Sequence, residues 1–373
     1  MVNHIGITNF KSIKSLELDT SRINLFIGKP NVGKSNLLEA LSFFDNYENK
    51  DLRIENTRNL FYDQDVKNTI SIKINNSHQF IDFKSNRFRS VSLSEQALNS
   101  KIAELKLDFR ANKEAAAKIE SISEVLSELQ SKELFSDTFI NKLDEVIKLG
   151  LVCEGEINSD GKFTKNKPNF VKHDFIIKKY IFNNTIHSKN LSRNNDYLHL
   201  AHPYGENIFD LLKNDRSLLT EISSFFEEYG YSLIIDFVSN EAEIQKMIGN
   251  IGYKIPYSLI ADTLQRMVFY IAAIRSNENT TILLEEPENH SFPPYIRDIA
   301  FEIISSSNQF FIATHSPYLL NTLIAEADSK DLSINIVSLK NYKTVVKTIS
   351  EKEVSEISNY GIDAFFNLNL FSK

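Results

Sequence analysis

The sequence contains one cysteine, no tryptophan and only three methionines among its 373 residues. Because Cys153 has no second cysteine to pair with, an intrachain disulfide is excluded. No segment approaches the roughly 18 consecutive apolar residues that predict a membrane-spanning helix. The N-terminal segment also lacks the apolar region of a signal peptide. We therefore expect a cytoplasmic protein that has no membrane partner.

Apolar residues make up 42% of the sequence and charged residues 24%, which is ordinary for a globular protein. The formal net charge is −7, so affinity for DNA would have to come from a local basic patch. We interpret each short basic segment as part of a surface exposed to solvent, and DNA binding is the alternative interpretation. The candidate segments contain Lys84, Arg87 and Arg89; Lys165, Lys167 and Lys172; and Lys178 and Lys179.

Residues 28–35 read GKPNVGKS and fit the pattern G-x-x-x-x-G-K-[ST] of a phosphate-binding loop. The apolar run before the loop predicts a buried strand, and apolar residues at helical spacing after it predict a helix. In this context we expect backbone N–H groups and Lys34 to bind phosphates and Ser35 to bind Mg²⁺. The candidate ATP-binding residues are Gly28, Asn31, Gly33, Lys34, Ser35 and Asn36.

The same octapeptide looks like the first motif of small GTPases, so a GTP switch is one alternative. A GTPase also needs D-x-x-G, which occurs nowhere in the sequence, and N-K-x-D after a buried strand. The tetrapeptide NKLD, residues 141–144, lies instead among apolar residues at helical spacing and fits a helix surface. The sequence therefore argues against a GTP switch.

Residues 281–288 read TILLEEPE, a short apolar run followed by adjacent acids. A buried strand that ends in two acids beside a phosphate loop is the Walker B arrangement. We expect Glu285 to hold Mg²⁺ through its water shell and Glu286 to polarise the attacking water. Without the phosphate loop, a surface acidic loop would be the simpler interpretation.

A third polar strand end lies in residues 308–321, NQFFIATHSPYLLN, where an apolar run is followed by Thr314, His315 and Ser316. A predicted helix, residues 295–307, separates this strand from the Walker B strand, so the two should be parallel neighbours. Their functional ends then meet at the carboxyl edge of one sheet. His315 can there hydrogen-bond the γ-phosphate, although a single histidine at a strand end more often has a structural role.

The order of the motifs separates this chain from GTPases and ring-forming AAA+ motors, in which Walker A and Walker B lie much closer together. Here Glu286 follows Lys34 after roughly 250 residues. A long insertion, a helix, Walker B and then a histidine is the order of ABC-type ATPases. In that class the helix before Walker B, here residues 258–277, carries a signature whose N-terminus contacts the γ-phosphate in a second subunit. The candidate contacts are Ser258, Ala261 and Thr263.

At these residues the chain resembles the SMC/RecF-like branch of ABC ATPases, and it is most similar to stand-alone ATPases related to the OLD (overcoming lysogenization defect) proteins. The resemblance lies in ITNFKSIKSLELD, LFIGKPNVGKSNLLEALSFF, PYGENIFDLL, ILLEEPENHSFPPY and ATHSPYLLN, within about residues 1–90 and 175–345. It implies an α/β P-loop NTPase fold of ABC or SMC-head type. Such a fold has a mixed and parallel sheet with flanking helices, an antiparallel β subdomain and an inserted helical subdomain.

The chain departs from the family pattern in three places. Glu285 stands where many relatives have Asp, although OLD-like members often share this Glu. The signature region, residues 257–266, has no glycine, and the Asp262 carboxylate would repel a γ-phosphate unless it points away. Residues 316–373 leave no room for the TOPRIM nuclease domain of OLD nucleases, so we expect a separately encoded effector.

We divide the chain into three parts. Residues 1–93 form an N-terminal lobe with Walker A and an antiparallel β subdomain that includes a hairpin at 68–83. Residues 94–150 contain no proline, and no glycine before Gly150; their apolar spacing predicts two or three inserted helices, either a packed subdomain or a projecting arm. Residues 151–373 form a C-terminal lobe with the signature helix, Walker B and the histidine.

Three shorter patterns complete the sequence-based predictions. Gln64 is the candidate Q-loop residue, which binds the metal in ABC proteins, and a polar turn residue is the equally simple interpretation. Residues 158–169 predict a loop, and residues 207–230 predict one helix that ends at Gly230.

Together these features predict an ATPase that uses ATP and Mg²⁺ and forms a dimer or higher homo-oligomer around ATP. The resemblance implies that it regulates a separately encoded nuclease or toxin in bacterial anti-phage defence, with DNA as a candidate trigger. The alternative is a RecF/SMC-like DNA-repair or DNA-maintenance ATPase without an effector. A transporter ATPase subunit is disfavoured because the glycine-rich signature is missing.

Overall fold

The computed structural model describes most of the chain in eleven segments. These are residues 1–44, 56–84, 87–108, 113–130, 146–147, 153–158, 163–165, 173–183, 198–236, 241–360 and 364–371. Everything below concerns these residues. The predicted GTPase tetrapeptide, residues 141–144, lies outside them.

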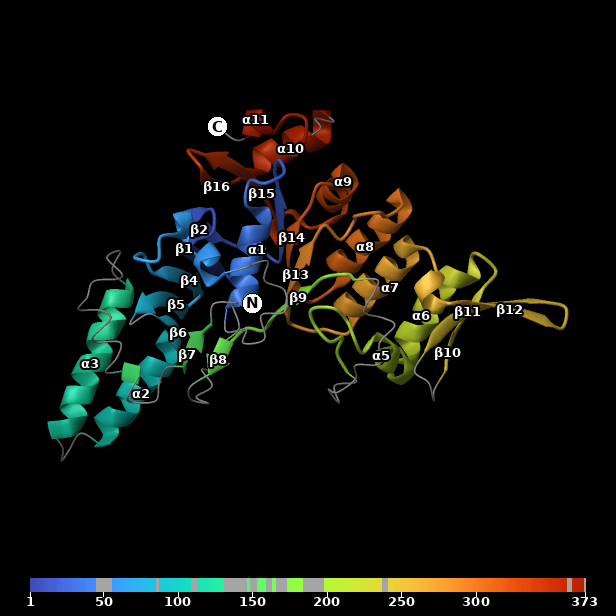
Figure 1. The fold of residues 1–373 in the computed structure, drawn as a ribbon. Coiled ribbons are helices and arrows are strands. Elements are labelled where there is room, and N and C mark those ends of the chain that lie inside the picture. Colours follow the sequence, from blue (N-terminus) through green and yellow to red (C-terminus); the bar gives the residue numbers. More distant parts are fainter. Residues whose placement is uncertain are drawn as a thin grey trace.

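A six-stranded sheet forms the centre of the molecule (Figure 1). Its strand order is β16 (Lys343–Thr348), β15 (Leu332–Lys340), β3 (Ile23–Ile27), β14 (Gln309–Ala313), β13 (Thr281–Glu285) and β9 (Ile177–Tyr180). All neighbours are parallel except β15 and β16, which pair as an antiparallel hairpin. The predicted parallel arrangement of the Walker B strand and the strand before His315 is confirmed.

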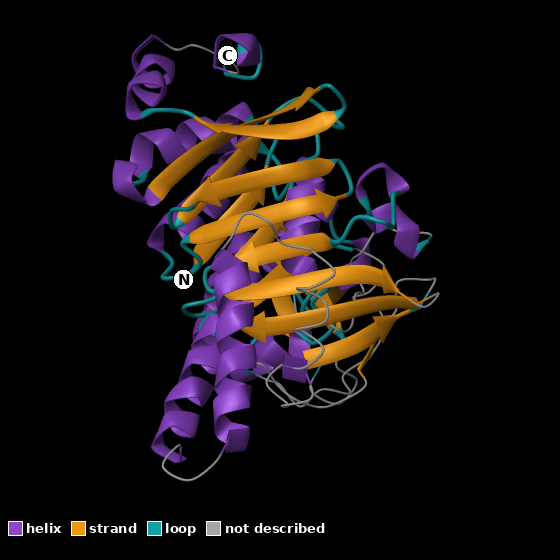
Figure 2. Cartoon of the chain, turned by 90° about the vertical axis from the view of Figure 1, so that its left-hand side faces the viewer, coloured by secondary structure: helices purple, strands orange, loops and turns teal. Residues whose placement is uncertain are grey.

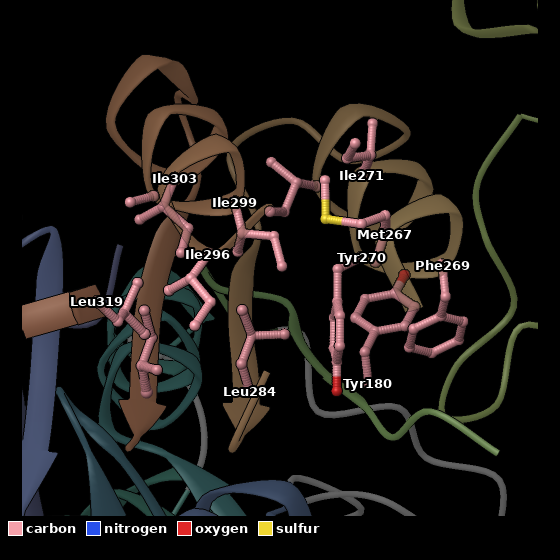
Figure 3. Close-up of a cluster of buried hydrophobic side chains, with 14 of the residues drawn as sticks. Tyr180, Met267, Phe269, Tyr270, Ile271, Leu284, Ile296, Ile299, Ile303 and Leu319 are labelled. Atoms are coloured by element: carbon pink, nitrogen blue, oxygen red, sulfur yellow. The ribbon is translucent and has the colours of Figure 1, made fainter. Parts of the chain in front are cut away.

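Successive residues of a strand point to opposite sides of the sheet, and both sides are buried because other elements cover each of them. In β13, Ile282 and Leu284 join one hydrophobic cluster and Leu283 joins another. The helices that contribute to the first cluster include α5 (Ile208–Asn214), α6 (Arg216–Glu227), α7 (Asp262–Arg275), α8 (Pro293–Ser305) and α9 (Pro317–Glu326). Figure 3 shows part of it, with α7 and α8 packed on β13 and β14. The second cluster lies under α1 (Lys34–Phe43) and the N-terminal strands.

An antiparallel β subdomain is what the resemblance implies, and the N-terminal strands form a seven-stranded antiparallel sheet together with two later strands. Its order is β2 (Ile13–Asp19), β1 (His4–Phe10), β4 (Ile70–Ile74), β5 (Ser77–Lys84), β6 (Arg87–Ser94), β7 (Cys153–Ile157) and β8 (Phe163–Lys165). The sequence division placed β7 and β8 in the C-terminal lobe. The predicted hairpin at 68–83 is confirmed as β4 and β5, joined by a turn at Asn75 and Asn76. Two short 3₁₀ helices, η1 (Thr57–Leu60) and η2 (Tyr62–Gln64), precede β4.

Two of the predicted inserted helices are present, α2 (Glu95–Asp108) and α3 (Lys113–Gln130). Apolar residues of both helices pack against Phe80, Val91 and Leu93 of β5 and β6. Figure 2 shows the pair side by side, with its far end extending past the edge of the sheet. The helices are therefore anchored to the sheet at one end and project at the other.

A small three-stranded antiparallel sheet contains β10 (Ser232–Ile235), β11 (Ala242–Ile248) and β12 (Ile251–Pro256), followed by η3 (Tyr257–Leu259). At the C-terminal end, η4 (Ser329–Asp331) precedes β15, and α10 (Glu351–Tyr360) and α11 (Leu368–Phe371) follow β16. Among the described helices, none has the combination of length and apolar character that crossing a bilayer requires.

Three predicted elements differ from the structure. The single helix expected at 207–230 is divided into α5 and α6, because Asp215 ends the first helix and caps the second by accepting a hydrogen bond from the Leu218 N–H (2.9 Å). The signature helix expected from residue 258 begins at Asp262, after η3. The loop expected at 158–169 contains the short strand β8.

Candidate active site

The loop between β3 and α1 has a backbone that suits glycine at two positions. Gly33 has a φ of 102°, and a Cβ atom there would lie 2.1 Å from the Thr344 Oγ1. A Cβ atom at Gly28 would lie 2.2 Å from the Val337 carbonyl oxygen. Asn31 also has a positive φ, 61°, and its side chain is exposed. The loop is thus a compact turn held against the β15–β16 hairpin.

Lys34, the first residue of α1, directs its side chain back into this loop. Its Nζ donates hydrogen bonds to the carbonyl oxygens of Gly28 and Lys29, both at 2.9 Å. Burial lowers the pKa of Lys34 to about 8, although Glu286, Glu285 and Glu288 oppose this effect by favouring the charged amine. A buried amine surrounded by loop carbonyls and acids is well placed to receive an anion.

Ser35 and Glu285 meet at the end of the Walker B strand. The Ser35 Oγ donates a hydrogen bond to the Glu285 Oε1, and so joins the first turn of α1 to the last residue of β13. Both groups offer oxygen atoms, the ligands that Mg²⁺ prefers. The residues that the sequence assigned to the metal from two distant motifs are therefore adjacent.

Glu286 and His315 follow β13 and β14, and the structure brings them together. Glu286 has a φ of 47°, and its N–H donates to the Ala313 carbonyl oxygen (2.8 Å). The His315 Nε2 lies 3.7 Å from the Glu286 Oε1. Burial, and then the nearby Lys34, lower the pKa of His315, whereas Glu286 opposes the shift. His315 is thus mainly neutral at pH 7.

Glu288 is a residue that the sequence interpretation missed. Its Oε1 accepts hydrogen bonds from the Thr314 hydroxyl (2.7 Å) and from the His315 N–H (2.9 Å). Burial raises the pKa of Glu288, and these hydrogen bonds act in the opposite direction. Glu288 therefore ties the Walker B turn to the strand end that carries His315. The only signal in the sequence was a third acid after Pro287.

Lys179 is the second missed residue, and here the interpretation of the basic segments was wrong. Lys179 lies in β9 and is only 2% exposed, so it belongs neither to a solvated face nor to a DNA-binding surface. Its Nζ lies 3.9 Å from the Glu285 Oε2. Its neighbour Lys178 donates to the Asn277 Oδ1 (2.6 Å).

In the first basic segment, both arginines are paired with acids. Arg87 is paired with Glu156 at 2.8 Å, and Arg89 with Asp82 at 2.7 Å. Lys84 and Lys165 lie in β5 and β8, and Lys167 and Lys172 lie outside the described residues. No exposed basic patch is therefore assembled by these arginines.

At the N-terminus of α7, Ala261 is the exposed capping residue. The Asp262 carboxylate accepts a hydrogen bond from the Arg266 Nε (2.7 Å) one turn along the helix. The Thr263 hydroxyl donates to the His290 carbonyl oxygen (2.8 Å). Ser258 lies before the helix, in η3, and is exposed.

The remaining predicted site residues are Asn36 and Gln64. The Asn36 amide donates to the Ser12 Oγ (2.7 Å), which is itself hydrogen-bonded to the Thr344 Oγ1 (2.7 Å). Asn36 thereby holds α1 to the β1–β2 turn and the β15–β16 hairpin. Gln64 lies in η2, is exposed, and has a positive φ of 56°; its role in a Q-loop stays a prediction.

A surface hollow of about 290 Å³ opens beside the two strand ends. Glu286, Glu288 and His315 line it together with the N-terminal part of α8 and residues 289–291. Charged and polar groups from the Walker B turn and from the histidine strand end therefore face a common space.

Comparisons with known proteins identify the family of the chain and its fold. Residues 1–320 match the model of a protein family described as AAA ATPase domain. A Helicobacter pylori protein named ATP/GTP phosphatase is 33% identical over 88 residues, 19% of this chain and 24% of the relative, so the match spans about a quarter of that protein.

Two solved structures are similar across nearly the whole chain. An SMC head bound to the C-terminal winged-helix domain of ScpA is 14% identical with a TM-score of 0.50, over 95% of this chain and 99% of that one. The SMC head domain from Thermotoga maritima is 12% identical with a TM-score of 0.41, over 94% and 99%. The first likeness, together with the sheets described above, shows an α/β P-loop NTPase fold of SMC/ABC type.

Proposed function

The chain belongs to the AAA ATPase domain family, and from this premise we propose that it binds ATP with Mg²⁺ at the carboxyl edge of the six-stranded sheet and hydrolyses it to ADP and phosphate. The observation that carries this proposal is the contact between Ser35 and Glu285, with Glu286 and His315 on the neighbouring strand ends. These contacts support the proposal because they bring the phosphate loop, the proposed metal ligands and the candidate base close together.

Each group has a distinct proposed role. Backbone N–H groups of the loop and the Lys34 amine bind the phosphates, and Ser35 and Glu285 hold the metal. When bound, Mg²⁺ would offset the negative charge of the β- and γ-phosphates. Glu286 orients and polarises the attacking water, and the neutral His315 donates a hydrogen bond to the γ-phosphate.

We also propose that ATP is enclosed between two copies of the chain, with the N-terminus of α7 reaching the ATP of its partner. The pairing of Asp262 with Arg266 supports this proposal, because it neutralises the carboxylate that would otherwise repel a phosphate. Since the Thr263 hydroxyl is bonded to the His290 carbonyl oxygen, the free N–H groups at Ala261 and the following residues are the better contacts.

The resemblance to OLD-related ATPases supports a further part of the proposal. The chain would act in the cytoplasm and control a separately encoded nuclease or toxin in anti-phage defence. DNA would be the trigger for this control. It would not bind through Lys179, because that residue is buried.

The test compares ATP and GTP hydrolysis by the purified chain, by Glu286→Gln and by Glu278→Gln. Glu278 is an exposed glutamate before the other end of β13, so its substitution is a matched control. We expect Glu286→Gln to lower kcat by about 10²–10⁴-fold while Glu278→Gln does not. Faster turnover of GTP than of ATP, or full activity of Glu286→Gln, would contradict the proposal.

A further inference from the structure

Lys179 is a buried cation beside the Walker B strand. Its side chain is only 1% exposed, and it lies on β9, which pairs in parallel with β13. Removing a charged amine from water is costly unless an opposite charge compensates for it. The Glu285 Oε2, at 3.9 Å, supplies that charge.

Glu285 is consequently held from two directions. Its Oε1 accepts a hydrogen bond from the hydroxyl of Ser35, in the first turn of α1. Its Oε2 faces Lys179 on the neighbouring strand β9. A glutamate has one more rotatable bond than an aspartate, and therefore more conformational freedom to lose when it is fixed in one orientation. Two fixed neighbours restrict this freedom before any ligand binds.

We propose that Lys179 is a positioning residue for the metal site: it holds the Oε2 of Glu285, so that the Oε1 stays beside Ser35. This inference rests on the proposed ATP and Mg²⁺ site and adds a residue to it. Lys179 itself touches neither the metal nor the phosphates in this arrangement. It acts through Glu285, as outer partners of metal ligands commonly do.

Loss of a positioning residue and loss of a positive charge would change the strength of Mg²⁺ binding in opposite directions. A cation near the metal site repels Mg²⁺, so its removal on electrostatic grounds alone would strengthen metal binding. Loss of positioning instead weakens it, because the glutamate must then be ordered when the metal binds. The direction of the change thus separates the two effects.

The experiment uses the full chain carrying Glu286→Gln, which prevents hydrolysis, and measures binding of a fluorescent ATP analogue as MgCl₂ is added. Lys179→Met is compared with Lys178→Met, a matched control on the same strand whose amine bonds to Asn277. We expect Lys179→Met to raise the half-saturating Mg²⁺ concentration by about tenfold and to leave analogue binding in EDTA unchanged. Lys178→Met should match the parent, and Lys179→Arg should recover part of the loss. If Lys179→Met shows no cooperative thermal unfolding, Lys179→Gln replaces it.

A second comparison isolates the contact itself. In a Glu285→Asp background the shorter side chain loses its reach to Lys179, so Lys179→Met should have little additional effect. Unchanged or tighter Mg²⁺ dependence of Lys179→Met, or full additivity with Glu285→Asp, would overturn the positioning role while leaving the proposed function intact. A parent protein that binds the analogue without any Mg²⁺ dependence would overturn both.

Discussion

His315 and Glu286 face each other across the ends of two parallel strands, with the His315 Nε2 3.7 Å from the Glu286 Oε1. This separation is too long for a direct hydrogen bond. Both side chains are therefore able to contact a third group, such as a water molecule, that lies between or beside them. The hollow in front of them is lined by both residues. An attacking water at Glu286 and a γ-phosphate oxygen at His315 fit this relationship.

Replacing His315 should slow hydrolysis more than it weakens binding. We expect His315→Ala to lower kcat by about 10²-fold with a small change in KM, because its hydrogen bond is needed most where charge develops on the transferred phosphoryl group. Steady-state ATPase kinetics measure both constants. A rise in KM at constant kcat would show instead that His315 serves only to bind ATP.

Nucleotide affinity should depend on pH through Lys34. The pKa of Lys34 is about 8 in the free protein, and bound phosphates favour the charged amine, so its pKa is higher in the complex. Affinity is therefore expected to be nearly constant below pH 8 and to fall by up to about tenfold per pH unit above it.

Calorimetric titration with ATP between pH 7 and pH 9.5 checks this dependence. Lys34→Arg supplies the control, because arginine stays charged throughout this range and should flatten the curve. An affinity that rises with pH in the unmodified chain would be incompatible with the assigned role.

The N-terminus of α7 should be needed for assembly on ATP. With Glu286→Gln and ATP, we expect a dimer or higher oligomer, and adding Ala261→Trp should prevent it because the exposed capping position becomes bulky. Light scattering coupled to size-exclusion chromatography measures the mass, and Glu278→Trp tests a bulky change at an exposed site elsewhere. ATP affinity of the monomer should stay unchanged, since Ala261 is not on the phosphate loop. Assembly that survives Ala261→Trp would exclude α7 from the contact.

Phe311 should be important for stability. It is fully buried in β14, and its ring stacks on Phe26 of β3 with centroids 6.1 Å apart. Phe311→Ala is expected to lower the free energy of unfolding by about 3–5 kcal/mol, through lost burial and the cavity left behind. Leu339→Ala, at a position that is 46% exposed, should change it by less than about 1 kcal/mol. Denaturant titrations give both values, and equal effects would refute the packing argument.

The strands and helices around the site could be predicted because each element is specified by a short stretch of consecutive residues. The strand before GKPNVGKS and the helix after it are β3 and α1, and the apolar runs before Glu285 and His315 are β13 and β14. The crossover rule then placed the two strand ends side by side. The roles assigned to these residues remain proposals.

What the sequence could not predict depends on which distant strands become neighbours. Lys179 looked like a surface residue because nothing in its own segment shows that β9 pairs with β13. The sequence also contained no sign that the Asn36 amide donates a hydrogen bond to Ser12, more than twenty residues earlier. The assignment of Asn36 to ATP stays a prediction. The division of the helix at Asp215 was missed because the apolar spacing continues across the break.

The position of β3 in the sheet has a consequence for how a new chain matures. Its two neighbours, β14 and β15, come from residues 309–313 and 332–340. Because the ribosome makes the chain in sequence order, the phosphate loop emerges long before β14 and β15, and β3 cannot be enclosed until both of these strands have been made. Such distant pairing is slow and leaves the strand exposed to wrong partners in the meantime. A truncated chain that ends before about residue 332 would lack β15, and the phosphate loop would then have no β15 to pack against.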